Sequence, residues 1–282
     1  MKSTLFGFFL IFCSFNTSYK FVYSQGGLEG IILEKFYISS KEDNSKPELS
    51  GHLAPGSITY RIYVDLKPGY TFQAAYGAPN HELYIKSTNL FYNHIEYGAE
   101  YPNRIPLRTY SRNTSRLDSW LSAGGAGENQ IGVLKTEDDT LNVFKTSGAY
   151  LTNHSKKMGI SLEVVDGMKE QYNLTFPTFY QMDSTIKGLG TITNTNTIST
   201  NNGAWASMGK GSQGADSLSN KVLIAQLTTD GKLSYQLNLL IGTPDGKSEK
   251  YVAHNPIEGE FTHPDLYSVT KKMKKKMKKK IF

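Results

Sequence analysis

Apolar and polar side chains alternate along most of the chain. Between Ile58 and Val64 every second residue is apolar, and the same spacing returns between Leu233 and Ile241. A period of two predicts β-strands, because successive side chains of a strand point to opposite faces of its sheet. After the leader, no stretch of ten or more residues shows the 3.6-residue period of an amphipathic helix. The pattern predicts an all-β fold of the β-sandwich type, built from antiparallel strands.

Turn residues divide this pattern into separate segments. The apolar-rich run Leu28–Ile38 predicts either a strand pair or one long strand. The other predicted strands are Ile58–Val64, Tyr70–Tyr76, Glu82–Lys86, Leu90–Tyr92, Asp118–Ser122, Ile131–Lys135, Leu141–Thr146, Ile160–Val165, Val222–Leu227, Leu233–Ile241 and Glu249–Ala253. Asp230-Gly231 predicts a two-residue type I′ hairpin turn, because such a turn needs positive φ at both central positions. Asp245-Gly246 extends the hairpin into a three-stranded meander. Tyr101–Arg116 and Gly188–Gly214 predict long exposed connections.

Two domain arrangements fit these strands. The first is a pair of successive β lobes, residues 25–150 and 151–265, with a boundary near Thr146–Lys157. The second is one large sandwich, since a single β domain can reach roughly 200–250 residues. The sequence leaves both open.

The first 24 residues have the features of a secretory signal peptide. Lys2 supplies a positive start, and the apolar run from Leu5 to Phe15 is shorter than the ~20 residues that a membrane-spanning helix needs. Ser24 places a small residue before the predicted cleavage, which leaves Gln25 first. Cys13, the single cysteine, lies inside this leader. We therefore expect a secreted or cell-surface protein that is stabilised by apolar burial without an internal disulfide.

The net charge of +6 is concentrated at the end of the chain. Eight lysines lie between Lys271 and Lys280, so acidic residues outnumber basic ones in the rest of the processed chain. This distribution does not indicate a specific nucleic-acid surface. Met273, Met277 and Ile281 would share one side of a basic amphipathic helix, which could lie on an anionic surface. Mutual repulsion of the lysines instead favours a disordered tail over residues 266–282.

Three stretches resemble a known kind of protein. They are SITYRIYVDLKPGYTFQAAYG, DSWLSAGGAGENQIGVLKTED and VLIAQLTTDGKLSYQLNLLIGTPDG, which begin at Ser57, Asp118 and Val222. Together they resemble secreted β-rich proteins of Bacteroidetes-type bacteria, in which such a block usually forms an extracellular β-sandwich region of a longer polypeptide. The resemblance implies a β-sandwich and export, and it supplies neither an activity nor functional residues. The lysine run stands where further domains or a sorting module would be expected.

Residues suited to metal binding are scattered. No two of the six histidines have the spacing of zinc ligands, and the bland interpretation is that they are exposed loop residues: His52, His81, His94, His154, His254 and His263. No cofactor is predicted. Asp138-Asp139 could help to bind one structural calcium ion, but the six to eight oxygen ligands that calcium prefers are not evident in the sequence. A solvated turn is the simpler interpretation.

Catalytic motifs are equally weak. Gly211-Ser212-Gln213-Gly214 is one residue too short for a serine nucleophile elbow and lacks the phosphate-loop ending. Pairs of carboxylates, which glycosidases use as acid and base, are the one alternative. The available carboxylates are Glu29 and Glu34, Glu96 and Glu100, Glu137 with Asp138 and Asp139, and Glu258 and Glu260.

Trp205 is the single candidate ligand-binding residue. It lies among asparagine, glycine, alanine and serine, where an exposed ring could stack on a sugar or anchor a protein partner. The competing interpretation is a ring that folds back over the end of the sandwich, and Trp120 alternates like a core residue. We therefore expect a non-catalytic binding, adhesive or structural protein, whose partner is a glycan or an envelope protein. The alternatives are a secreted polysaccharide hydrolase with paired carboxylates and a membrane-active protein driven by the lysine tail.

Overall fold

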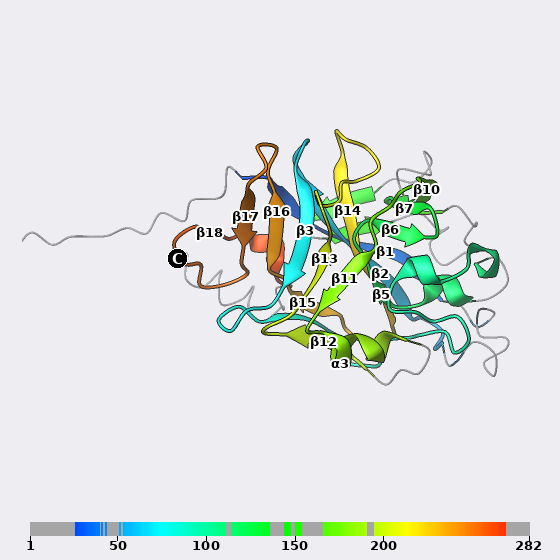
Figure 1. Cartoon of the computed structure of the whole chain (residues 1–282). Helices are drawn as coiled ribbons and strands as arrows, with labels where there is room; N and C mark the ends of the chain where they lie inside the picture. Colours follow the sequence, from blue (N-terminus) through cyan, green and yellow to red (C-terminus); the bar gives the residue numbers. More distant parts are fainter. Residues whose placement is uncertain are drawn as a thin grey trace, which may run out of the picture.

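Two six-stranded sheets form the body of the molecule (Figure 1). The computed structural model describes residues 26–39, 41, 43, 51, 53–110, 114–135, 144–147, 150–153, 166–190 and 195–268. The first sheet has the order β5 (Trp120–Leu121), β14 (Asn220–Thr229), β2 (Ile58–Leu66), β1 (Leu28–Ile38), β9 (Tyr150–Asn153) and β8 (Phe144–Ser147). The second has the order β11 (Pro177–Tyr180), β13 (Ala204–Ser207), β3 (Thr71–Tyr76), β16 (Leu239–Gly242), β17 (Ser248–Tyr251) and β18 (Glu260–Phe261). The predicted all-β sandwich is confirmed.

Two three-stranded sheets complete the described strands. One has the order β10 (Met168–Glu170), β7 (Gln130–Gly132) and β6 (Gly125–Gly127). The other has the order β12 (Thr197–Thr200), β4 (Leu83–Lys86) and β15 (Ser234–Gln236). Most strand pairs are antiparallel, as predicted, but β1 pairs with β9 and β17 with β18 in the parallel direction.

The main core fills the space between the two large sheets. Ile62 and Val64 of the first sheet and Phe72, Trp205 and Ile241 of the second belong to one apolar cluster, and each is fully buried. The alternation in the sequence therefore reflects burial of one face of each sheet against the other.

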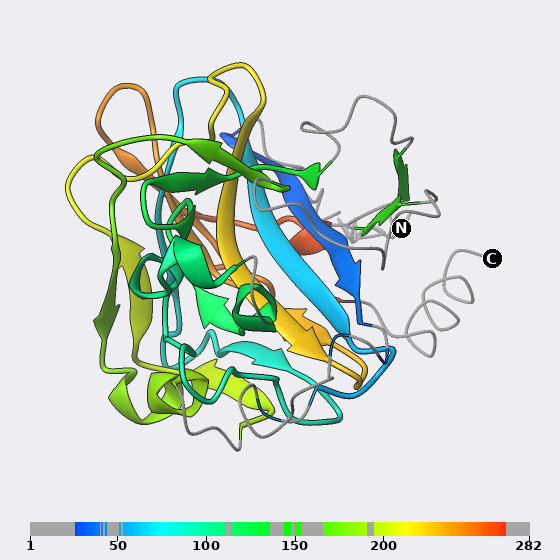
Figure 2. The same ribbon diagram turned by 90° about the vertical axis from the view of Figure 1, so that its right-hand side faces the viewer.

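The outer face of the first sheet is buried as well. There Tyr63 and Leu223 pack against Trp120, Ile105 and Tyr110 in a second apolar cluster. The segment that covers them contains three 3₁₀-helical turns, η2 (Pro102–Arg104), η3 (Leu107–Thr109) and η4 (Thr114–Leu117). Figure 2 shows these turns beside and in front of β14, a strand of the first sheet. The prediction that Tyr101–Arg116 is an exposed connection is wrong, because Ile105 and Tyr110 of this segment are buried in the second apolar cluster.

Arg61 of β2 also lies on this covered face and is only 1% exposed. Its Nε donates to the Gln226 side chain at 2.9 Å, and its Nη1 donates to the Gly167 carbonyl at 2.7 Å. The guanidinium carbon lies 3.6 Å from the centre of the Phe36 ring. Hydrogen bonds and a cation–π contact thus replace the water that this charge would otherwise require.

The sheets do not divide near Thr146–Lys157. Strand β14 pairs with β2, β13 and β16 pair with β3, and β12 and β15 pair with β4. Segments from both predicted lobes, 25–150 and 151–265, are therefore neighbours in every one of these sheets. The described strands form one interleaved sandwich.

The predicted hairpin at Asp230-Gly231 is wrong. Both sides of β14 are taken by β2 and β5, while β15 pairs with β4. Neither Asp230 nor Gly231 has a positive φ. The connection is instead held against the end of β4, where the hydroxyls of Ser87 and Thr229 lie 2.8 Å apart and Asn89 donates to Asp230 at 2.9 Å.

The second predicted turn is a true hairpin. Gly242 of β16 pairs with Ser248 of β17, and Gly246 between them has a φ of 82°. The proposed three-stranded meander thus reduces to this two-stranded hairpin. Tyr235, Leu237, Leu239 and Ile241 are all fully buried in the main core, as their alternation predicts.

Other local predictions differ in detail. Leu90–Tyr92 forms no strand, and the connection predicted over Gly188–Gly214 contains β12 and β13. The longest α-helix in the described ranges is α3 (Asp183–Ile186), which is followed by the 3₁₀ turn η5 (Lys187–Leu189). Within these ranges we find no helix with the length and apolar character needed to cross a bilayer. The leader, residues 269–282 of the predicted tail, Ile160–Val165 and Asp138-Asp139 lie outside the described residues. The prediction of disorder from residue 266 onward is wrong at its start, because Leu266 is fully buried in the main core and the Ser268 backbone N–H donates to the Tyr235 carbonyl at 2.9 Å.

Candidate ligand-binding site

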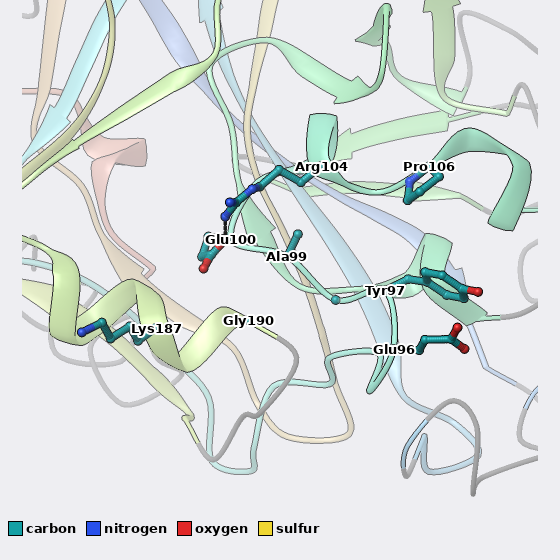
Figure 3. Close-up of a pocket in the computed structure, with 9 residues that line it drawn as sticks. Glu96, Tyr97, Ala99, Glu100, Arg104, Pro106, Lys187 and Gly190 are labelled. Carbon is teal, nitrogen blue, oxygen red and sulfur yellow. Dashed lines mark hydrogen bonds and ion pairs between the residues drawn. The ribbon is translucent and has the colours of Figure 1, made fainter.

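A hollow of about 530 Å³ opens between the segment 96–106 and the end of η5 (Figure 3). We call it the charged hollow, because two carboxylates and two cationic side chains lie among its lining residues: Glu96, Tyr97, Gly98, Ala99, Glu100, Arg104, Pro106, Lys187 and Gly190. It is open to solvent and not enclosed. The pair Glu96 and Glu100, considered for catalysis from the sequence, is thus gathered around one concave surface.

The backbone of this segment is held from below by Asp118. The Asp118 carboxylate accepts hydrogen bonds from the backbone N–H of His94 at 2.7 Å and of Ala99 at 2.9 Å. Asp118 is fully buried, and this burial raises the pKa of its carboxyl well above the ordinary value, although the hydrogen bonds oppose the shift. A Cβ on Gly98 would meet the His94 carbonyl oxygen at 2.5 Å, so the tight loop requires glycine there.

Asn93 ties the two walls of the charged hollow together. Its Nδ2 donates to the carbonyl of Ser119 at 2.8 Å and to that of Leu189 at 2.7 Å. Leu189 belongs to η5, which carries Lys187 at its start and is followed by Gly190. A buried side chain thereby fixes the position of η5 relative to the loop that supplies Glu96 and Glu100. Such support keeps the lining groups in place before a ligand arrives.

His94 is also buried beneath this loop, contrary to the expected exposure. Its Nδ1 accepts from the backbone N–H of Glu96 at 3.2 Å and of Tyr97 at 3.1 Å. Nδ1 is therefore unprotonated and the neutral ring carries its proton on Nε2. Burial lowers the pKa of His94, with Glu96 acting in the opposite direction. The ring contacts Tyr97, with the centroids 5.3 Å apart.

The charges are unevenly placed around the hollow. Arg104 Nη1 donates to Glu100 Oε2 at 2.8 Å, and its guanidinium lies 5.4 Å from the Tyr101 ring centre. Figure 3 shows Arg104 and Glu100 pointing toward one another on the side where Lys187 lies, with Glu96 and Tyr97 at the other end. A glycosidase pair must face the same bond from two sides. Here Glu100 is paired with Arg104, and Glu96 lies at the other end of the hollow.

The other carboxylate pairs are engaged elsewhere. Glu34 is fully buried and accepts from the backbone N–H of Lys135 at 2.7 Å, whereas Glu29 is exposed. Glu260 lies 3.2 Å from the buried His81, and Glu258 is exposed. The structure does not describe Glu137, Asp138 or Asp139. Burial of His81 also contradicts the expected exposure of this residue.

Trp205 does not lie on the surface. It is a residue of β13, is 0% exposed, and pairs with Phe179 on one side and Ala75 on the other. The prediction that the Trp205 ring stacks on a ligand is therefore wrong, because both faces of the ring lie inside the main core. Two short period-two segments, Thr197–Thr200 and Ala204–Ser207, were the signal for strands here. Their polar composition concealed that signal.

A second hollow, of about 630 Å³, lies beside the glycine-rich segment 210–214. We call it the amide hollow, because amide and hydroxyl side chains predominate in its lining: Thr71, Gln171, Asn173, Thr175, Ser212, Gln213 and Ser217, with Lys210 as the cation. Ser212 contributes its hydroxyl to a 2.7 Å hydrogen bond with Ser207. Asn173 and Gly211 have φ values of 60° and 83°, so both loops depend on residues that tolerate left-handed backbone.

Within the described ranges, no three residues among histidine, cysteine, aspartate and glutamate gather in a way that could hold a metal ion. His254 is exposed and its ring lies 4.4 Å from that of Tyr267, while His263 is half-buried near Asp265. His52 and His154 lie outside those ranges.

Taken together, the sheets and the hollows define an all-β sandwich with open, polar surface sites. Comparison with family models, with curated proteins and with solved structures finds no match to this chain. The resemblance to secreted Bacteroidetes-type proteins accordingly stays a prediction.

Proposed function

We propose that this chain is an exported, non-catalytic β-sandwich protein that binds an acidic saccharide in the charged hollow. One observation supports this proposal above the others. A single open hollow is lined by two cationic side chains, two carboxylates and one tyrosine: Arg104, Lys187, Glu96, Glu100 and Tyr97. Saccharides present many hydroxyl groups that both donate and accept, so they need a site with donors and acceptors side by side.

We propose an acidic ligand because the two cationic side chains of the hollow, Arg104 and Lys187, lie on the same side of it. Arg104 uses one nitrogen for Glu100, and the guanidinium has further N–H groups on its planar fork. Its side chain is 58% exposed, and Lys187 is exposed on the same side of the hollow. In this proposal a uronic acid carboxylate pairs with the remaining N–H groups of Arg104 and with Lys187, and its ring hydroxyls lie toward Glu96 and Tyr97.

The test is calorimetric titration of the full chain with uronate and neutral oligosaccharides. We expect saturable uronate binding that weakens with added salt, because exposed ion pairs are screened. Arg104→Ala combined with Lys187→Ala should weaken binding about tenfold or more, which corresponds to ~1.4 kcal/mol. Lys250→Ala is the matched control, since Lys250 is exposed on β17 in the second sheet.

The lysine tail needs its own control, because it can attract any polyanion. The same titrations are repeated after deletion of residues 271–282. Binding that disappears with the tail and ignores Arg104 would refute the proposal and favour a tail-driven interaction with anionic surfaces. Absence of binding by every saccharide would refute it as well.

The hydrolase remains the second candidate, because Glu96 and Glu100 do line one hollow. Release of reducing ends from a bound polysaccharide measures it directly. We expect none. Release that is lost in both Glu96→Gln and Glu100→Gln would establish catalysis in place of simple binding.

A further inference from the structure

We infer that the charged hollow and the amide hollow are the two ends of one extended binding surface, and that its ligand is a linear polysaccharide. This inference rests on the proposed function and extends it from a single sugar to a chain. It is carried by the segment 171–176, which lines the amide hollow through Gln171, Asn173 and Thr175 and contacts Tyr101, a neighbour of Arg104, through Phe176.

The first link joins the amide hollow to Phe176. Gln171, Asn173 and Thr175 line that hollow, and the backbone N–H of Gln171 donates to the Asn129 carbonyl at 2.9 Å. Phe176 follows directly in the chain and is 56% exposed. A half-exposed aromatic ring thus follows directly, along the chain, the residues that line the amide hollow.

The second link joins Phe176 to the charged hollow. The Phe176 ring lies 6.2 Å from the Tyr101 ring in an edge-to-face arrangement. The guanidinium carbon of Arg104 lies 5.4 Å from the centre of the same Tyr101 ring. Arg104 in turn lines the charged hollow together with Glu100. Contacts therefore run from Thr175 through Phe176 and Tyr101 to Arg104 without a break.

This order of chemistry fits a polysaccharide better than a peptide or a single sugar. A sugar ring has an apolar C–H face that packs on an aromatic ring, and hydroxyl groups around its rim. One sugar unit cannot occupy two hollows that have no lining residue in common. A linear chain can place one unit in each hollow and an intermediate unit against the exposed ring.

The test is a length series of one uronate-containing oligosaccharide, from two to eight units, titrated into the full chain. We expect the affinity to rise at least tenfold between the shortest and the longest members, because linked contacts add without a new cost of association. Phe176→Ala and Gln171→Ala should each remove most of that gain, about tenfold, and leave the affinity for the disaccharide unchanged.

Phe261→Ala is the matched control, since Phe261 is a partly exposed aromatic residue on β18, at the opposite edge of the second sheet from β11. It should change no member of the series. An affinity that is independent of length, yet still requires Arg104 and Lys187, would overturn the extended surface and leave the proposed function intact. Failure of all members to bind would remove both.

Discussion

The guanidinium of Arg61 lies 3.6 Å from the centre of the Phe36 ring, inside the molecule and beneath the covering segments of the first sheet. The two residues come from adjacent antiparallel strands, β2 and β1. Arg116 and Lys135 approach the same ring, at 5.7 Å and 5.8 Å. A buried aromatic face thus serves as a shared partner for three cations that are nearly excluded from solvent.

This arrangement predicts that Arg61 stabilises the fold. Arg61→Met removes two buried hydrogen bonds, to Gln226 and Gly167, while keeping most of the side-chain volume. We expect a loss of roughly 2–4 kcal/mol in the free energy of unfolding, since a buried group that loses its partner costs ~1–3 kcal/mol. Denaturant titration measures it. Arg108→Ala, at an exposed position, should change stability by less than ~0.5 kcal/mol; equal effects would contradict the assigned role.

The raised pKa of the buried Asp118 carboxyl should make the free energy of unfolding depend on pH. Because burial holds its pKa in the folded state well above the ordinary value near 3.8, the folded protein binds a proton that the unfolded chain releases. The contribution of this group to stability is therefore present below about pH 4 and is lost as the pH rises through the folded-state pKa. Asp118→Asn cannot titrate.

The variant should consequently be less stable than the parent by an amount that is largest near pH 4 and shrinks at higher pH. Unfolding free energies of both proteins, measured at intervals from pH 4 to pH 8, test this directly. A deficit that stays constant or grows with pH would show that Asp118 is charged throughout.

Because Trp205 is fully buried, we expect substitutions of Trp205 to lower the stability of the fold and to leave saccharide affinity unchanged. Trp205→Ala should cost ~3–5 kcal/mol, as large-to-small changes in a core do. Trp205→Phe should cost much less, because Nε1 of Trp205 has no hydrogen-bond partner among the described residues and none is lost. Saccharide affinity of the folded Trp205→Phe protein should equal that of the parent in calorimetric titration. A selective loss of affinity would restore the ring as a ligand contact.

Substitutions of Gly231 and Gly246 test whether the hairpin turn lies at Asp245-Gly246 and not at Asp230-Gly231. A Cβ on Gly231 would lie 2.3 Å from the Ser87 hydroxyl oxygen and 2.5 Å from the Asn89 backbone nitrogen. Gly246 has a φ of 82° and open space around it. Asparagine tolerates left-handed backbone, so Gly246→Asn should cost less than ~1 kcal/mol. Gly231→Asn should cost more than ~2 kcal/mol because backbone must move.

Thermal unfolding of the two glycine variants compares these values. A type I′ turn at Asp230-Gly231 would give Gly231 a positive φ, which asparagine tolerates, and would therefore predict a small cost for Gly231→Asn. Equal tolerance at both positions would therefore count against the contacts described for this connection.

Local pattern determined part of the strands of this protein, among them the two long central strands β1 and β2. The apolar-rich run Leu28–Ile38 and the alternation over Ile58–Val64 placed β1 and β2 closely, and Asp245-Gly246 identified the true hairpin. These features depend on residues that are near in sequence, so the side-chain period and the turn chemistry are sufficient to predict them. Polar composition misled where burial came from distant segments, as at Trp205 and in the segment 101–116.

Tertiary structure decided which strands pair and which residues meet at the site. Strand β14 finds its partners more than 90 residues away, in β2 and β5, so no local turn signal could reveal them. The sequence contained Glu96, Glu100 and Arg104 close together, yet only the fold brought Lys187 beside them and placed Asp118 beneath. Non-local pairing is decided by the burial of whole sheet faces, a property of the folded chain that a short stretch of sequence does not contain.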